Sequence, residues 1–107
     1  MALPDRETRL DEAELARWLP ASGWSRDGEA LTKSFRCKGW KSAIAFVDRI
    51  AVAADELDHH PDIHVERYRS VRVMTTTFAT GMLSDADVAL AKRIDELADV
   101  SGGAASR

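Results

Sequence analysis

Residues 41–58, KSAIAFVDRIAVAADELD, carry the strongest periodic pattern in the chain. Apolar side chains recur there at steps of three and one residues, and charged side chains occupy the other side. This spacing is typical of an amphipathic helix that buries one stripe. Pro61 follows shortly, and a proline disfavours the helical conformation in the residue before it. The pattern therefore predicts a helix over about 41–58, built on the apolar positions Ile44, Val47, Ile50, Ala51, Ala54 and Leu57.

Candidate strands flank this helix on both sides. Asp27-Gly28 is a hairpin turn signal between the first two strands. The last two are rich in β-branched side chains, and we expect a tight link between them at Arg69-Ser70. Hairpins of this kind pair their strands in antiparallel fashion. The expected strands are residues 24–26, 30–36, 64–68 and 70–77.

Two outer helices complete the pattern. Each begins with a polar residue that is followed three positions later by an acidic one, the spacing of a capping box. The first helix is expected over about 11–19 and ends at Pro20, which cannot continue a helix. The last helix is expected to run to about residue 99. The capping pairs are Asp11 with Glu14 and Ser84 with Asp87.

The order of elements predicts the fold class. It is a single α+β domain, α-β-β-α-β-β-α, with a four-stranded antiparallel sheet and three helices covering one face. The domain is expected over residues 10–99. Residues 1–9 are expected to form a flexible leader, and residues 100–107, which are small and rich in glycine, a flexible tail.

Composition makes several classes of function unattractive. The 107 residues include 15 Lys and Arg against 18 Asp and Glu, so the formal net charge is -3. There is no basic excess to neutralise phosphates, and no apolar run is long enough to span a membrane. We therefore expect no nucleic-acid contact and no membrane contact. The single cysteine, Cys37, cannot form an internal disulfide, which agrees with a cytoplasmic location.

All three histidines of the chain lie within residues 58–64, DHHPDIH. Three interpretations are open from the residues alone. They are surface histidines at a helix end, where the helix dipole mildly favours a cation. They bind a metal with the flanking aspartates, although Pro61 breaks the helix between the i, i+4 pair His60 and His64. Or they form an acid/base site, for which histidine is suited because its ordinary pKa lies near neutrality.

A longer pattern surrounds the triplet His59-His60-Pro61. Three residues separate the acidic Asp55 from the start of the triplet, and six residues separate the end of the triplet from the aromatic Tyr68. Asp87 stands beyond them at the end of the pattern. This arrangement resembles that of the pterin-4a-carbinolamine dehydratase family, also called 4a-hydroxytetrahydrobiopterin dehydratases. The resemblance covers about residues 10–99.

The resemblance implies dehydration of a 4a-hydroxytetrahydropterin to a quinonoid dihydropterin, in pterin recycling, by histidine acid/base catalysis. His59 is then the candidate acid or base, and His60 is a second catalytic candidate that helps to hold the substrate. No metal and no cofactor are implied. The partners would be the pterin substrate and further copies of the chain, in a homodimer or homotetramer. The substrate-binding candidates are Asp55, Pro61, Tyr68, Thr76, Thr77, Phe78 and Asp87.

One position departs from the family's pattern. Phe78 stands where the family has a later histidine or tryptophan, and a phenylalanine cannot move a proton. His60 or His64 would then take the second proton role. The alternative is a catalytically weak or inactive member that binds a pterin or acts as a protein-assembly or interaction module. The enzyme predicts an open pocket lined by His59, His60 and Phe78, whereas the interaction module predicts a pocket filled by Phe78 and Met82.

Overall fold

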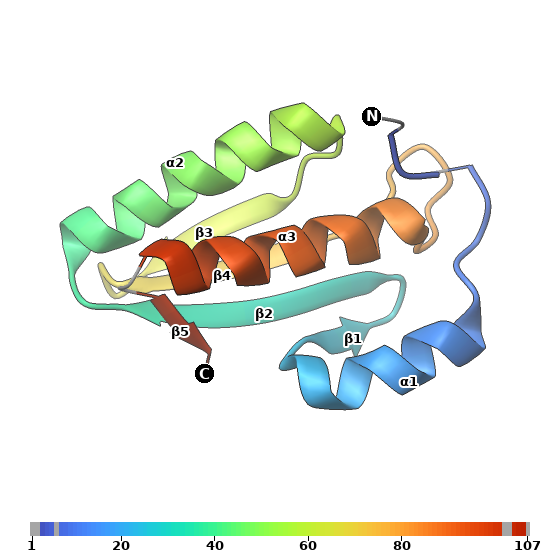
Figure 1. Ribbon diagram of the computed structural model, residues 1–107, viewed down its shortest axis with the longest axis horizontal. Helices are drawn as coiled ribbons and strands as arrows, with labels where there is room; N and C mark the ends of the chain where they lie inside the picture. The colour runs from blue at the N-terminus through green and yellow to red at the C-terminus, as the bar shows by residue number, and fades with distance from the viewer. Residues whose placement is uncertain (1–2, 6, 102–103, 107) are drawn as a thin grey trace.

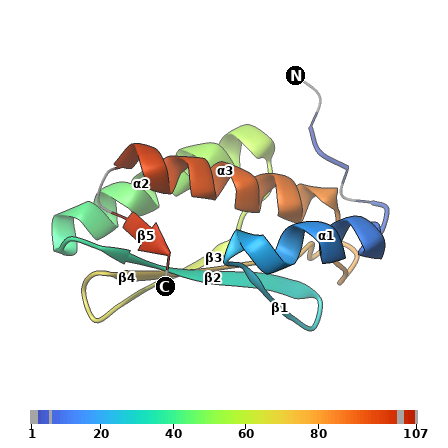
Figure 2. The same ribbon diagram turned by 60° about the horizontal axis from the view of Figure 1, so that its bottom comes forward.

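The periodic segment forms the long helix α2 (Trp40–Leu57) in the computed structural model, which describes residues 3–5, 7–101 and 104–106. The outer helices are α1 (Glu12–Ser22) and α3 (Asp85–Ser101). Figures 1 and 2 show all three helices on the same face of the sheet, with α2 and α3 side by side. Within the described residues, no helix has the length and hydropathy to cross a membrane.

The sheet is antiparallel throughout, with the order β1-β2-β4-β3. Both hairpins are formed by strands that are neighbours in the sequence, and the central pairing joins the two hairpins. A fifth short strand lies beside the end of β2 (Figure 1). The strands are β1 (Ser25–Asp27), β2 (Ala30–Cys37), β3 (Asp62–Glu66), β4 (Ser70–Thr75) and β5 (Ala104–Ser106).

The expected order of elements, α-β-β-α-β-β-α, and the single antiparallel α+β domain are confirmed. Strand β5 was not expected, because its residues are small and carry no alternating pattern. The flexibility of the leader 1–9 and of the tail 100–107 stays a prediction. Residues 1, 2, 6, 102, 103 and 107 of those segments lie outside the described residues.

The boundaries that differ most from the prediction are those of α1 and β3. Helix α1 continues through Pro20 and ends at Gly23, which adopts the left-handed conformation (φ 82°) that terminates many helices. Pro20 lies in the last turn, where its missing N–H removes one intrahelical hydrogen bond without ending the helix. Strand β3 starts directly after Pro61, so the link to β4 is the three-residue turn 67–69, with positive φ at Arg67 and Tyr68.

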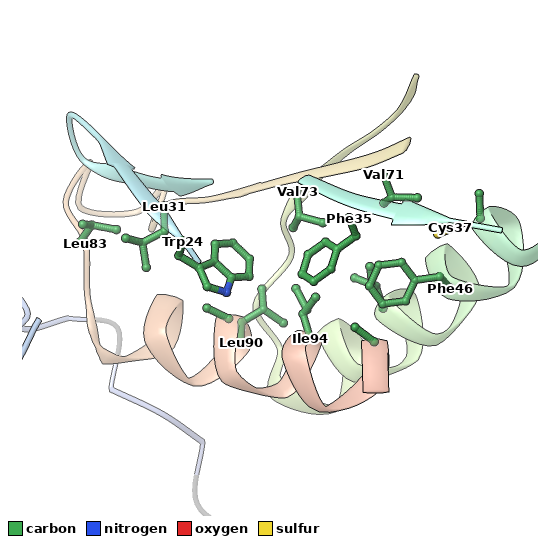
Figure 3. Close-up of a cluster of buried hydrophobic side chains, with 14 of the residues drawn as sticks. Trp24, Leu31, Phe35, Cys37, Phe46, Val71, Val73, Leu83, Leu90 and Ile94 are labelled. Atoms are coloured by element: carbon green, nitrogen blue, oxygen red, sulfur yellow. The ribbon is translucent and has the colours of Figure 1, made fainter. Parts of the chain in front are cut away.

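The core lies between the sheet and the helices (Figure 3). Phe35 of β2 makes edge-to-face contacts with Trp24 and with Phe46 of α2, at centroid distances of 6.2 and 5.1 Å. Such aromatic pairs add to the energy of burying their area. Ile94 of α3 packs into the same cluster, so this core fixes α2 and α3 relative to the sheet.

We predict that Phe46→Ala lowers the free energy of unfolding by about 3–5 kcal/mol, because Phe46 is fully buried and the cavity cannot refill. Phe78→Ala is the matched control, since Phe78 is 74% exposed, and it should cost less than about 0.5 kcal/mol. Urea unfolding followed by circular dichroism measures both. Equal losses in the two variants would contradict the packing described here.

Candidate active site

The end of α2 turns the histidine pair back toward the body of the protein. Asp58 adopts the left-handed conformation (φ 49°), which aspartate tolerates better than most residues. Its N–H donates to the carbonyls of Ala54 and Asp55, and the N–H of His59 donates to Ala54 at 3.0 Å. These bonds close the helix and fix the backbone from which His59 projects.

His59 makes a buried contact with Asp87 of α3. Its Nε2 lies 2.7 Å from Asp87 Oδ1, and the two side chains are almost completely shielded from solvent. The hydroxyl of Thr75 donates to the same carboxylate oxygen at 2.6 Å. The other oxygen, Oδ2, accepts from Thr77 Oγ1 at 2.7 Å and from the Ser84 N–H at 3.0 Å. Four donors therefore converge on one buried carboxylate.

The same carboxylate also caps α3. Asp87 Oδ2 accepts from the N–H of Ser84, and Ser84 Oγ accepts from the N–H of Ala86 at 3.3 Å, so the capping box expected for Ser84 and Asp87 is confirmed. In α1, Asp11 accepts from the N–H of Ala13. The role of Asp87 in the helix start and its contact with His59 thus use different oxygens.

The pKa of Asp87 lies below its ordinary value. Burial alone raises this pKa. The hydrogen bonds from His59, Thr75, Thr77 and the backbone of Ser84 lower it, and together they outweigh the effect of burial. Asp87 is therefore ionised at neutral pH and can only accept hydrogen bonds. The neutral His59 ring must then carry its proton on Nε2, which leaves Nδ1 as an acceptor.

The ring of His59 links Asp87 to a pocket. Nε2 is the ring nitrogen that lies against Asp87, so Nδ1 is the nitrogen left for another partner. The side chain is only 7% exposed, and His59 is one of the residues that form the pocket wall.

This pocket has a volume of about 280 Å³ and is open to solvent. Phe78 contributes to its wall but lies mostly exposed, and Met82 is not among the lining residues. The interaction-module hypothesis required Phe78 and Met82 to fill this cavity, and neither side chain fills it. The wall is formed by Asp58, His59, His60, Thr76, Thr77, Phe78 and Ala79.

The loop that carries Phe78 is tied to the turn between β1 and β2. Thr76 Oγ1 donates to the carbonyl of Glu29, and the Glu29 carboxylate accepts from the N–H of Leu83 at 3.2 Å. Arg26 in turn contacts that carboxylate at 2.6 Å. Both ends of the loop 76–83 are thus held, which places Phe78 at the pocket wall.

His60 is held less firmly than His59. Its Nε2 lies 2.9 Å from Asp55 Oδ1, and both side chains are largely exposed. An exposed pair of this kind contributes little to stability, but it orients the ring. Asp55 and His60 are therefore neighbours, but only His60 is among the residues of the pocket wall.

Two residues singled out from the sequence lie outside this site. His64 is on the sheet face opposite Ile63 and Val65, beside Arg72, because strand side chains alternate. It cannot replace a pocket histidine from there. Tyr68 lies in the β3–β4 turn, at the end of β3 that is remote from the C-terminus of α2 (Figure 1). It is not among the residues of this pocket wall, and substrate binding by Tyr68 stays a prediction.

The Ser84–Asp87 pair was expected from the sequence, but Thr75 was missed as a partner of Asp87. The alternation of β4 could have indicated Thr75, since Val71 and Val73 face the core and Thr75 continues that side. Pro61 is not part of the pocket wall and lies between His60 and the start of β3. Within the described residues, no group of three or more His, Cys, Asp or Glu side chains could hold a metal ion.

The fold and the pocket define a small α+β protein with a histidine–carboxylate pair at an open cavity. The family model for pterin 4 alpha carbinolamine dehydratase matches residues 8–97. The protein "Putative pterin-4-alpha-carbinolamine dehydratase" of Thermomicrobium roseum is 43% identical over 91 residues, which are 84% of this chain and 97% of that protein. A relative of the same name from Sulfurisphaera tokodaii is 39% identical and covers 83% of this chain and 96% of that one.

Solved structures agree with these relatives. A transcriptional coactivator/pterin dehydratase from Brucella melitensis has a TM-score of 0.76 and 31% identity, covering 84% of this chain and 98% of that chain. A pterin dehydratase-like protein identified as a RuBisCO assembly factor in the alpha-carboxysome has a TM-score of 0.56 over 88% and 94% of the two chains. At 20% identity it shows a shared fold alone. The chain belongs to the pterin 4 alpha carbinolamine dehydratase family.

We predict that Asp87→Asn lowers the free energy of unfolding by about 1–3 kcal/mol at neutral pH, because an amide cannot accept from all four donors. Since the folded pKa of Asp87 is lowered, its contribution is complete above the ordinary value of 3.8 and is lost as the pH falls below it. The difference between wild type and variant should therefore shrink in acid.

Urea unfolding at a series of pH values measures this difference. The exposed neighbour Asp85, also in the first turn of α3, supplies the control variant Asp85→Asn, which should cost only a few tenths of a kcal/mol. A difference for Asp87→Asn that is no larger than that of the control would show that the network does not stabilise the fold.

Proposed function

We propose that this chain dehydrates a 4a-hydroxytetrahydropterin to the quinonoid dihydropterin, as in pterin recycling. The observation that carries the proposal is the His59–Asp87 pair, which engages one ring nitrogen of His59 at the wall of an open pocket. Membership of the family supports the same substrate class. A cytoplasmic location and assembly into a homodimer or homotetramer belong to this proposal as expectations.

The reaction needs two proton transfers and no redox change. The C4a–O bond breaks, and the hydroxyl leaves as water after it gains a proton. N5 loses its proton, and the electron pair of that N–H bond forms the new double bond between N5 and C4a. One acid and one base near adjacent atoms of the substrate are therefore sufficient.

His59 is suited to the role of base. With its proton held on Nε2 by Asp87, the neutral ring presents Nδ1 as an acceptor for the N5 proton. The Asp87 carboxylate then stabilises the positive charge that the ring gains, as the buried carboxylate does in other histidine dyads. Asp87 therefore acts through His59 and not on the substrate.

His60 is the candidate for the second proton. It lies in the same pocket wall, and Asp55 orients its ring, whereas His64 lies on the other face of the sheet. In this role His60 protonates the departing hydroxyl. Phe78 offers an exposed aromatic face at the pocket, against which a flat pterin ring can pack. Thr76 and Thr77 complete the wall on the side of β4.

We predict that His59→Ala lowers kcat by about 10²–10⁴-fold, the usual cost of losing a general acid or base. The assay is a coupled turnover measurement with freshly generated 4a-hydroxytetrahydropterin. His64→Ala is the matched control, because His64 is an exposed histidine on the opposite face, and its turnover should equal that of wild type. Wild-type turnover in the His59 variant would sink the assignment of His59.

Phe78→His tests the alternative function, a family member that binds a pterin without converting it. The observation behind that alternative is that Phe78, in the pocket wall, cannot move a proton. If the chain is an enzyme that uses His59 and His60, wild type turns over and Phe78→His adds to an existing activity. Wild type at background, with turnover gained only in Phe78→His, would instead identify a pocket that binds without chemistry.

A further inference from the structure

Thr75 is an unusual residue for its position in β4. The core-facing residues of this strand are Val71, Val73 and Thr75, and all three are buried, with Thr75 only 1% exposed. A buried hydroxyl destabilises a core unless it finds a hydrogen-bond partner. Thr75 finds that partner in Asp87, across the gap between β4 and α3.

The hydrogen bond of Thr75 goes to the oxygen that serves His59. Asp87 Oδ1 lies 2.6 Å from Thr75 Oγ1 and 2.7 Å from His59 Nε2. The other oxygen, Oδ2, takes the bonds that start α3, from Thr77 and from the backbone of Ser84. Thr75 therefore has no part in the helix cap, and its hydroxyl bonds, among the described residues, to the carboxylate oxygen that His59 uses.

The directions of these bonds are fixed. The ionised carboxylate has no proton to give, so Thr75 and Thr77 must both donate to it. Thr77 has then used its only proton, so the Ser84 hydroxyl, 2.7 Å away, donates to Thr77. All the acceptor positions of Asp87 are occupied, and neighbouring bonds in such a chain influence one another.

We propose that Thr75 is a positioning residue for this site. Thr75 shares Asp87 Oδ1 with His59 and so sets how strongly the carboxylate holds the His59 ring. The inference rests on the proposed function only for its effect on turnover. With the Thr75 hydroxyl present, the negative charge of Oδ1 is divided between two donors. Without it, Oδ1 serves His59 alone, the Nε2–H bond strengthens, and a protonated ring is stabilised more.

The test compares Thr75→Val, which removes the hydroxyl at nearly constant shape, with Thr75→Ser, which keeps it. The first readout needs no substrate: it is the nuclear magnetic resonance signal of the His59 Nε2 proton. We expect Thr75→Val to move this signal downfield and Thr75→Ser to leave it near the wild-type position. Thr32→Val is the control, since Thr32 lies on the neighbouring strand and outside the pocket wall.

The second readout is the pH profile of kcat/KM. In Thr75→Val the acidic limb of this profile should move to higher pH by about half a unit. A shift of this size corresponds to a fraction of the energy of one hydrogen bond. Thr75→Ser should restore the wild-type profile. A purely structural role would lower the melting temperature of Thr75→Val without moving either readout, and that result would overturn the proposal.

The two proposals can fail separately. If wild type shows no turnover, the proposed function fails, and the proton signal alone decides the role of Thr75. If turnover is normal and the signal of Thr75→Val equals that of Thr32→Val, the role of Thr75 is refuted while the function stands. Thr75→Ala serves in place of Thr75→Val if that variant does not fold.

Discussion

The buried carboxylate of Asp87 is the group on which both the last helix and the histidine depend. One of its oxygens closes the N-terminus of α3, and the other holds His59 and Thr75. A buried charge is costly unless hydrogen bonds replace its hydration, and four donors do so here. The stability of α3 and the orientation of His59 are therefore coupled through one side chain.

The fold explains why these groups meet. The C-terminus of α2, the end of β4 and the start of α3 all lie at one end of the molecule (Figure 1). The αL turn at Asp58 aims His59 at α3, and the tie from Glu29 holds the loop with Phe78. The rigid core built on Phe35 and Phe46 fixes the two helices relative to each other, so the site is shaped before any ligand arrives.

Periodicity was sufficient to predict the three helices, the four strands of the two hairpins and their order, because α2 and the hairpins carry apolar patterns that the fold buries. The end of α1 was mispredicted, since the helix includes Pro20 and ends instead at Gly23, which adopts the left-handed conformation. For the site, the histidine pair and the capping box were visible in the sequence. The sharing of Asp87 between cap and histidine was not, because it joins residues from α2, β4 and α3 that only the tertiary fold brings together.

The most direct test of this account is the protonation of the His59 ring in the wild-type chain. A nitrogen–proton correlation spectrum of the imidazole rings, recorded at mildly alkaline pH without substrate, assigns the tautomer. The account predicts that the neutral His59 ring carries its proton on Nε2, bonded to Asp87, with Nδ1 unprotonated. A proton on Nδ1 in the neutral ring would contradict it, because the nitrogen assigned to the reaction would then be unable to accept one.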